Sequence, residues 1–382
     1  MGVERDGLRV LLTTDTVGGV WQFAIELAAQ LARGGDQVLL AAMGREPDAG
    51  QRRQAEAITG MEFHARPYKL VWMGDPWSDL DASGAWLHGL AREFAADVVH
   101  LNDLAHAELA WPAPVLVGAH SCVCSWWQAV HGGPAPASWD RYRARVAATL
   151  HAADLVVAPT RAMLDALLRH HGPVAPARVI HNGRSPGVEA HASREPFVLG
   201  AGRLWDEAKN LGALAAVAAR LPWPVYLAGD ARHPDGTEAD FGSARVLGRL
   251  PDVQLRRWTA RAAIYALPAR YEPFGLSALE AAQCGCALVL GDIPSLREVW
   301  GDAALFVHPD DHDALAAALQ RLIDDDALRD ALALRARLRA RRYTPEAMAS
   351  RYRDAYVDII DRRHAPAERD TPPMRAAAGA RA

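Results

Sequence analysis

The chain has 382 residues, which is enough for two domains that each bury a hydrophobic core. Half of the residues are hydrophobic and 23% are charged, a composition typical of soluble globular proteins. The net charge of −4 at pH 7 gives no bulk reason to expect binding to nucleic acid or to an anionic membrane.

The sequence predicts a cytoplasmic protein. Segment 1–9 is charged, and the apolar run at 8–12 is too short for the core of a secretory signal. No apolar run approaches the length needed to span a bilayer, so we expect no transmembrane segment. The closely spaced Arg141, Arg143 and Arg145 are compatible with a local basic face. Peripheral membrane contact has no support in the sequence.

The chain opens with a strand at 9–14, a turn containing Gly18 and Gly19, a helix over 20–31 and a strand at 37–43. This order predicts a doubly wound α/β domain, in which ligands gather at the carboxyl ends of parallel strands. The turn lacks the Gly-x-Gly-x-x-Gly pattern, which argues against an ordinary dinucleotide site.

The rest of the first domain, predicted to span residues 1–182, continues to alternate strands and helices. Polar residues follow two of its strands: Asn102 and Asp103 follow one, and His120 follows the next. Segment 121–136 is predicted to be a loop. Further strands are expected at 61–64, 97–101, 115–119, 155–158 and 178–180, and helices at 48–58, 86–95, 139–150 and 160–170.

A linker is predicted at 183–196, where glycine and proline occur without periodicity. The second domain is predicted over 197–344, followed by a helix at 345–363. The segment 364–382, rich in Ala, Pro and Arg, is predicted to be a disordered tail. Strands of the second domain are expected at 197–200, 225–228, 245–247, 264–267 and 287–290, and helices at 313–323 and 327–341.

The most informative stretch is a strand–turn–helix unit that contains Glu272, Phe274, Gly275, Leu276 and, inside the helix, Glu280. A helix start leaves unpaired N–H groups and a partial positive charge, which together favour a phosphate. Gly275 has no Cβ, so a ligand oxygen can approach the backbone closely. Glu272 and Glu280 would repel a diphosphate but can accept hydrogen bonds from hydroxyl groups on either side of it. A ligand that carries hydroxyl groups on both sides of a diphosphate is a nucleotide sugar, so the stretch predicts a site for such a ligand.

A second candidate lies earlier in this domain, where Arg203 and Lys209 follow the strand at 197–200. Two cations six residues apart after a strand end can bind one diphosphate, with the planar fork of arginine and the point charge of lysine. Lysine occurs in the whole chain only at positions 69 and 209, which makes Lys209 conspicuous. The alternative is that Arg203 and Lys209 are solvated surface residues that bind no ligand.

These residues resemble a known family. Glu272 and Glu280 match the Glu-x7-Glu signature of retaining glycosyltransferases with the GT-B fold, and the run Glu-Pro-Phe-Gly-Leu is similar to family 4. The Gly-Arg-Leu…Lys-Asn run with Arg203 and Lys209 is similar to the phosphate-binding pair of that family. The resemblance reaches to residue 363. It implies two Rossmann-like doubly wound parallel-sheet domains with an interdomain cleft, and a last helix that returns to the first domain.

The resemblance also implies roles for the donor site. Glu272 would contact the donor sugar, Glu280 would contact the ribose, and the N–H groups of Phe274, Gly275 and Leu276 would hold the phosphates. The turn with Gly18 and Gly19 would face the donor phosphates across the cleft. Base contacts are placed only roughly, in the region 248–253.

His120 matches the histidine that the family places near the donor sugar. It would exchange a hydrogen bond with the sugar or move protons near neutral pH, and a structural role is the alternative. Asp15 is interpreted as a cap for the helix after Gly19, with a general base as the alternative. Asn102 and Asp103 are weaker candidates for the acceptor site. Trp126 and Trp127 are predicted to stack on acceptor sugars or, equally, to pack in the core.

The four cysteines form two Cys-x-Cys pairs, Cys122 with Cys124 and Cys284 with Cys286. Neither pair has the two-residue spacing of zinc sites, and a reducing cytosol disfavours disulfides. We expect packing thiols, with a metal shared by the pairs as the alternative. No cofactor and no metal are expected for the reaction, because the cations replace a metal ion.

The sequence therefore predicts a retaining glycosyltransferase that moves a sugar from a nucleoside-diphosphate sugar to a carbohydrate or other hydroxyl-bearing acceptor. Nucleic acid is not an expected partner. A nucleotide-sugar epimerase with the GT-B fold and a non-catalytic nucleotide-sugar-binding protein are the alternatives. The nucleotide, the sugar, the acceptor and the oligomeric state cannot be read from the sequence.

Overall fold

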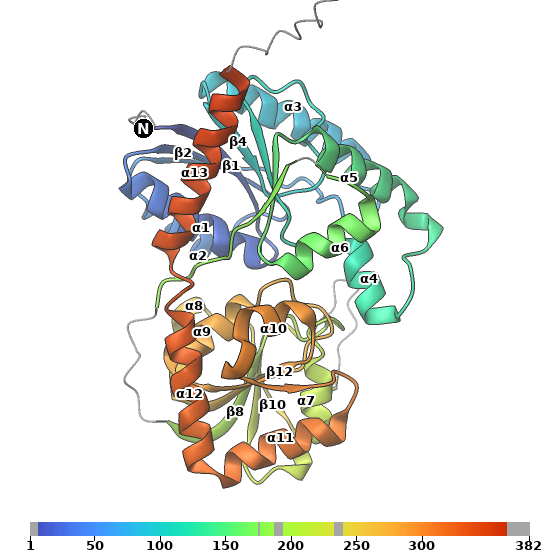
Figure 1. Cartoon of the computed structure of the whole chain (residues 1–382), viewed down its shortest axis with the longest axis vertical. Helices are drawn as coiled ribbons and strands as arrows, with labels where there is room; N and C mark the ends of the chain where they lie inside the picture. Colours follow the sequence, from blue (N-terminus) through green and yellow to red (C-terminus); the bar gives the residue numbers. More distant parts are fainter. Residues whose placement is uncertain (1–6, 175, 187–193, 233–239, 365–382) are drawn as a thin grey trace, which may run out of the picture.

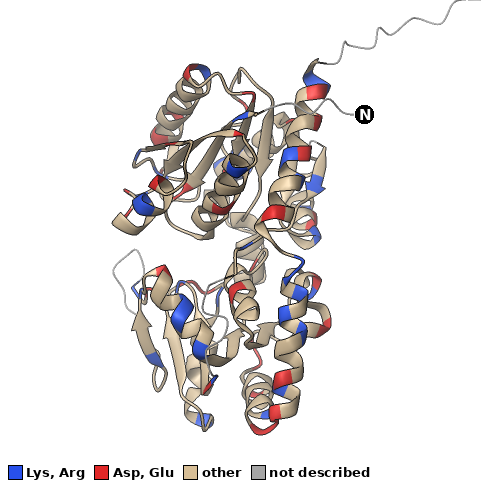
Figure 2. Ribbon diagram, turned by 90° about the vertical axis from the view of Figure 1, so that its left-hand side faces the viewer, with Lys and Arg blue, Asp and Glu red and all other residues tan. Residues whose placement is uncertain are grey.

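The computed structural model describes residues 7–174, 176–186, 194–232 and 240–364. Two lobes are stacked along the long axis, and each contains one parallel sheet (Figure 1). Every helix of the described ranges is too short or too polar to cross a membrane. Acidic and basic residues are interspersed over the helices of both lobes (Figure 2).

The first sheet has seven strands in the order β3-β2-β1-β4-β5-β6-β7. All neighbours pair in parallel. The order reverses between β1 and β4, which places the ligand-binding switch point of a doubly wound sheet at their carboxyl ends. The strands are β1 (Arg9–Asp15), β2 (Gln37–Met43), β3 (Met61–Ala65), β4 (Val98–Leu101), β5 (Val115–Gly118), β6 (Leu155–Ala158) and β7 (Ala177–Val179).

Both faces of this sheet are covered, as expected of parallel strands that are buried along their length. Side chains on one face pack against α1 and α13, and those on the other face pack against α3, α5 and α6. The helices of this lobe are α1 (Gly19–Arg33), α2 (Ala49–Glu56), α3 (Trp77–Glu93), α4 (Val123–His131), α5 (Asp140–Ala152) and α6 (Arg161–His171), with a short 3₁₀ helix at Ala137–Trp139.

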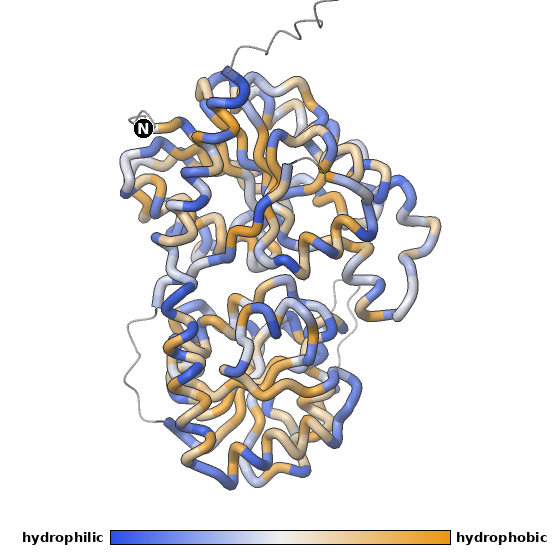
Figure 3. Tube along the Cα trace, viewed as in Figure 1, coloured by the Kyte–Doolittle hydropathy of each residue, from blue (hydrophilic) through white to orange (hydrophobic). Residues whose placement is uncertain are grey.

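The second sheet has six parallel strands in the order β10-β9-β8-β11-β12-β13, with its switch point between β8 and β11. The strands are β8 (Glu195–Ala201), β9 (Val225–Ala228), β10 (Arg245–Gly248), β11 (Ala262–Leu267), β12 (Ala287–Gly291) and β13 (Leu305–Val307). The helices are α7 (Leu211–Val217), α8 (Asp252–Arg261), α9 (Leu276–Cys284), α10 (Pro294–Trp300), α11 (His312–Asp324) and α12 (Asp326–Ala340), with 3₁₀ helices at Ala218–Arg220 and Gly301–Ala303. Hydrophobic residues follow the strands inside both lobes (Figure 3).

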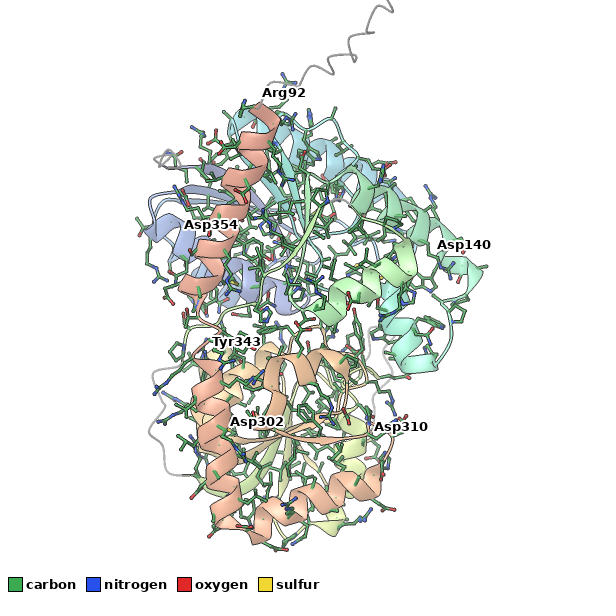
Figure 4. All side chains as sticks on the ribbon, in the orientation of Figure 1. Arg92, Asp140, Asp302, Asp310, Tyr343 and Asp354 are labelled. Atoms are coloured by element: carbon green, nitrogen blue, oxygen red, sulfur yellow. The ribbon has the colours of Figure 1, made fainter. Side chains whose placement is uncertain are left out.

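The last helix, α13 (Pro345–His364), leaves the second lobe and packs on the first (Figure 1). Its buried Tyr352, Tyr356 and Ile359 join Phe23 and Leu27 of α1 in one cluster. Tyr343, labelled in Figure 4, lies where the lobes meet, and its ring stacks on His181 at 5.4 Å between centroids. The fold class predicted from the sequence is confirmed: these are two doubly wound α/β lobes.

Three sequence predictions need correction or fall at least partly outside the described residues. Segment 121–136 was predicted as a loop, but it contains the helix α4, which ends at Gly132 in the left-handed conformation (φ 73°). The predicted linker is described only in part, because residues 187–193 lie outside the described ranges. The predicted tail lies outside them too, apart from His364, which ends α13.

Candidate donor site between the two lobes

The turn before α9 is held by the side chain of Glu272. Its Oε1 accepts the N–H of Gly275 at 3.0 Å and that of Phe274 at 3.4 Å. Gly275 has a φ of 92°, a left-handed conformation that favours glycine, and a Cβ there would lie 3.2 Å from Leu296 Cδ2. The other carboxylate oxygen, Oε2, lies 2.6 Å from Lys209 Nζ. The structure therefore brings together Lys209, Glu272 and the start of α9.

This geometry restricts which of the three predicted N–H groups are free to bind a phosphate. The N–H groups of Phe274 and Gly275 already donate to Glu272. The Phe274 side chain is buried and packs edge-on against Tyr343. The N–H groups of the first turn of α9, from Leu276 onward, lack acceptors within the helix and remain suitable for an anion.

Arg203 belongs to the same lobe as Lys209 and contacts the first lobe. Its Nη2 and Nε donate to Asp206 Oδ2 at 2.5 and 3.2 Å. Its Nη1 lies 3.3 Å from the point where a Cβ on Gly18 would be, so the guanidinium contacts the glycine turn of the first lobe. Any side chain at Gly18 would compete with Arg203 for this space.

The glycine turn faces α9 as well. A Cβ on Gly19 would lie 3.7 Å from Leu276 Cδ1, so the first turns of α1 and α9 approach each other. Each contributes a partial positive charge from its dipole. Asp15 does not cap α1, whose N-cap is Gly18. Its Oδ1 instead accepts the N–H groups of Val17 and Gly18 at 2.8 and 2.9 Å and shapes the turn.

The pKa of the Asp15 carboxyl is raised by burial, and its turn hydrogen bonds and the nearby charge of Arg203 oppose that rise. Asp206 shows the opposite balance, because Arg203 and Lys209 hold its pKa below the usual value in spite of burial. The two cations of the site therefore already have carboxylate partners, Arg203 with Asp206 and Lys209 with Glu272.

Glu280, inside α9, is paired with an arginine that sequence reasoning missed. Its Oε1 accepts Arg184 Nε at 2.6 Å, and its side chain is 18% exposed. Arg184 is buried and also contacts Glu26 of α1 and Asp252 of α8. Gln283 of α9 donates to the Arg184 carbonyl at 2.6 Å. Arg184 thus ties the end of the first lobe to α9.

His120 follows β5, and its Nε2 lies 2.8 Å from Asn102 Oδ1, at the end of the neighbouring β4. Asn102 in turn donates to the Thr13 carbonyl at 2.7 Å. The ring packs on Phe23 at 4.3 Å between centroids. Asn102 accepts the Nε2 proton, so Nδ1 is the nitrogen left to accept a hydrogen bond from a ligand.

The other three candidates for the acceptor site lie in different surroundings. Asp103 turns into the first lobe, where its Oδ1 lies 2.8 Å from His106 Nδ1 and its Oδ2 is buried. Trp126 donates from Nε1 to Asp206 Oδ1 at 3.2 Å and so forms part of the contact between the lobes. Trp127 packs on His131 at 4.4 Å between ring centroids and is partly exposed.

Two family models match the chain, one on each lobe. The model for Glycosyltransferase Family 4 matches residues 17–187, and that for Glycosyl transferases group 1 matches residues 195–325. The chain belongs to glycosyltransferase family 4. It is an enzyme of the transferase class.

Curated relatives of this glycosyltransferase differ in what they act on. A glycogen synthase of Mycobacterium tuberculosis is 28% identical over 85% of this chain and 86% of its own length. A D-inositol 3-phosphate glycosyltransferase of Xylanimonas cellulosilytica is 27% identical over 92% and 94%. An O-antigen chain mannosyltransferase B of Escherichia coli is 36% identical, but the match spans only 30% of each chain.

Solved structures confirm the GT-B fold of this glycosyltransferase. A sucrose-phosphate synthase from Thermosynechococcus elongatus superposes with a TM-score of 0.76 at 19% identity, covering 94% of this chain and all of the other. WaaG, a glycosyltransferase involved in lipopolysaccharide biosynthesis, superposes with a TM-score of 0.70 at 16% identity, covering 91% and 99%.

Further residues around the glycosyltransferase site join the lobes. Thr160 Oγ1 donates to the Pro273 carbonyl at 2.9 Å, directly beside the α9 turn. Glu298 of α10 accepts the N–H groups of Arg161 and Ala162 at 2.8 and 3.0 Å and so caps α6 of the other lobe. The Tyr271 hydroxyl accepts the Cys122 N–H at 3.1 Å. No local sequence signal marks these partners, because they meet only when the lobes pack.

We expect His120 to stay neutral throughout the working pH range. Burial lowers its pKa from 6.5 to about 4. Because the unfolded chain takes up this proton near pH 6.5, His120 adds stability above that pH, and this stability is lost as the pH falls toward 4. The His120 ring resonances, assigned by comparison with His120→Asn, should keep their neutral positions from pH 8 to 5. A midpoint above pH 6 would contradict this and would support proton transfer by His120.

Proposed function

We propose that this glycosyltransferase transfers a sugar, with retention of anomeric configuration and without a metal ion, from a nucleoside-diphosphate sugar to a hydroxyl-bearing acceptor. The second lobe would hold the donor, and the first lobe would hold the acceptor. One set of contacts carries the proposal: Lys209 meets Glu272 at the turn before α9, and the glycine turn of the first lobe lies against both Arg203 and Leu276.

In this proposal the diphosphate lies at the first turn of α9, where the dipoles of α1 and α9 both favour negative charge. Lys209 has three donors and Arg203 five, so each can bind a phosphate oxygen while it keeps or exchanges its carboxylate partner. As the bond to the sugar breaks, negative charge grows on the leaving phosphate. These fixed cations and amides then stabilise the transition state more than the ground state.

The carboxylates have separate tasks in this proposal. Glu272 positions Lys209 and the α9 turn, and it accepts a hydrogen bond from a hydroxyl group of the donor sugar. Glu280 accepts a ribose hydroxyl while Arg184 orients it. His120 Nδ1 accepts a hydrogen bond from the sugar. The acceptor hydroxyl attacks the anomeric carbon from the face that the phosphate leaves and gives its proton to the departing phosphate oxygen, so no protein nucleophile is required.

The acceptor is proposed to be a carbohydrate or another polyol. Two relatives that match along most of their length are named for glycogen and for D-inositol 3-phosphate, which share a dense array of hydroxyl groups. Trp127 is a partly exposed aromatic ring of the first lobe, and in this proposal it stacks on such an acceptor.

The test is a matrix of UDP-, GDP-, ADP- and dTDP-sugars against oligosaccharide and polyol acceptors, without added divalent cations. Release of the nucleoside diphosphate with a product whose anomeric configuration by NMR equals that of the donor would support the proposal. An inverted product would overturn the retaining mechanism. Conversion of the donor to an epimer without an acceptor, or donor binding without any turnover, would replace transfer by one of the two alternative functions.

A further inference from the structure

A cluster of three metal-ligating atoms lies at the start of α4, outside the donor site. Cys122 Sγ, Cys124 Sγ and one ring nitrogen of His171 all lie within 4.8 Å of one another. Cys122 is the N-cap of α4, and His171 is the last residue of α6. Cys122 Sγ lies 3.2 Å from His171 Nε2.

These separations suit a tetrahedral ion. Zinc binds thiolate sulfur at about 2.3 Å and imidazole nitrogen at about 2.0–2.1 Å, which sets ligand atoms roughly 3.5–3.8 Å apart. The three atoms are therefore already close to the spacing that one ion requires. The Cys-x-Cys spacing alone did not predict this site, because the third ligand comes from another helix, 47 residues after Cys124.

The surroundings hold the ligands in place. The N–H of Cys122 donates to the Tyr271 hydroxyl at 3.1 Å, and that of Val123 donates to the Tyr142 hydroxyl at 3.0 Å, so the backbone that carries the first sulfur is anchored on both sides. Cys122 and Cys124 are buried. Nε2 of His171 faces the Cys122 sulfur, while its Nδ1 is buried without a partner among the described residues.

We propose that Cys122, Cys124 and His171 bind one thiophilic divalent cation, with Zn²⁺ as the probe and the fourth position left to water or an added ligand. Two thiolates and an imidazole select such an ion over Mg²⁺ or Ca²⁺, which prefer oxygen ligands. For this cysteine pair the proposal takes a bound metal in place of the packing thiols expected from the sequence. In this proposal the ion does not contact the sugar or the phosphates, so the metal-independent transfer reaction is tested separately.

The ion would also steady the contact between the lobes. The N-cap of α4 meets Tyr271, and Trp126 on the same helix donates to Asp206, the partner of Arg203. A metal at the N-cap would fix the position of this helix against the second lobe. We therefore expect bound Zn²⁺ to raise the thermal unfolding temperature.

The test uses the full chain, reduced with a metal-free phosphine and loaded with Zn²⁺ or Co²⁺. We expect about one ion per chain, with thiolate-to-Co²⁺ charge-transfer absorption. His171→Asn and the double variant Cys122→Ser/Cys124→Ser should lose both signals while circular dichroism shows a retained fold. The matched control is Cys284→Ala/Cys286→Ala, which removes the other Cys-x-Cys pair and should keep both signals.

Three outcomes would overturn the proposal. One is metal binding that persists in the His171 and Cys122/Cys124 variants, which would show an unrelated site. Another is absence of a thiolate absorption band in the folded wild-type protein. The third is a Cys122–Cys124 disulfide that survives the reductant, which would make the pair a redox element instead.

Discussion

Lys209→Ala should lower kcat/KM for sugar transfer by about 10²–10³-fold, the effect of removing one preorganised donor to a developing negative charge. Two losses combine in this variant. The leaving phosphate loses a cation, and the Glu272 carboxylate loses its partner at 2.6 Å. Lys209→Arg should recover only part of the activity, because the guanidinium is planar and longer than the ammonium it replaces.

The chain supplies a matched control for this prediction. Lys69, the other lysine in the sequence, is exposed, and its Nζ bonds to the carbonyls of Gly74 and Asp75 in the first lobe. Lys69→Ala should leave kcat/KM within about twofold of wild type, as surface changes usually do. Donor turnover measured for both variants at equal folded concentration makes the comparison. Full activity in Lys209→Ala would remove Lys209 from the proposed donor site.

The fold class was predictable because its signals are local. Each lobe opens with a buried strand, a glycine-containing turn and a helix, and these short units repeat along the chain. Parallel strands covered on both faces give continuous apolar runs that need no long-range information. The helix α4 escaped prediction, since its Cys, Trp and His residues are not strong helix formers. The Gly132-Gly133 pair that ends it was the available signal.

The parts of the candidate site that belong to one short motif were predictable from the sequence. Arg203 with Lys209 and Glu272 with Gly275 stand on single turns, and the structure brings these turns together. The pairing of each cation with a carboxylate was not predictable. Asp206 lies only three residues after Arg203, but nothing in the sequence says that it turns back to it. Donor binding must therefore exchange or share these contacts.

Arg184 marks the limit of reading the sequence, because its partners come from three separate helices. Glu26 lies 158 residues before it, and Asp252 and Glu280 lie 68 and 96 residues after it. In the sequence Arg184 is only one residue of an irregular segment. Its role appears once α1, α8 and α9 surround it.

Arg184→Met should destabilise the folded protein by about 3–5 kcal/mol, the usual effect of removing one partner from a buried ion pair. Arg184 Nη1 lies 2.8 Å from Glu26 Oε1, and both residues are buried. The methionine would leave Glu26 and Glu280 close together without a countercharge. The unfolding midpoint in urea, followed by circular dichroism, measures the change.

Two further variants separate charge from packing. Arg178→Met removes an exposed ion pair with Asp358 at 2.6 Å and should cost no more than about 1 kcal/mol. Adding Glu26→Gln to Arg184→Met should restore part of the lost stability, because it removes one of the stranded carboxylates. Equal midpoints for Arg184→Met and Arg178→Met would mean that Arg184 packs against its neighbours without its charge mattering. A large loss that Glu26→Gln relieves would instead establish Arg184 as the charged link that holds α9, and with it the proposed ribose-binding Glu280, against the first lobe.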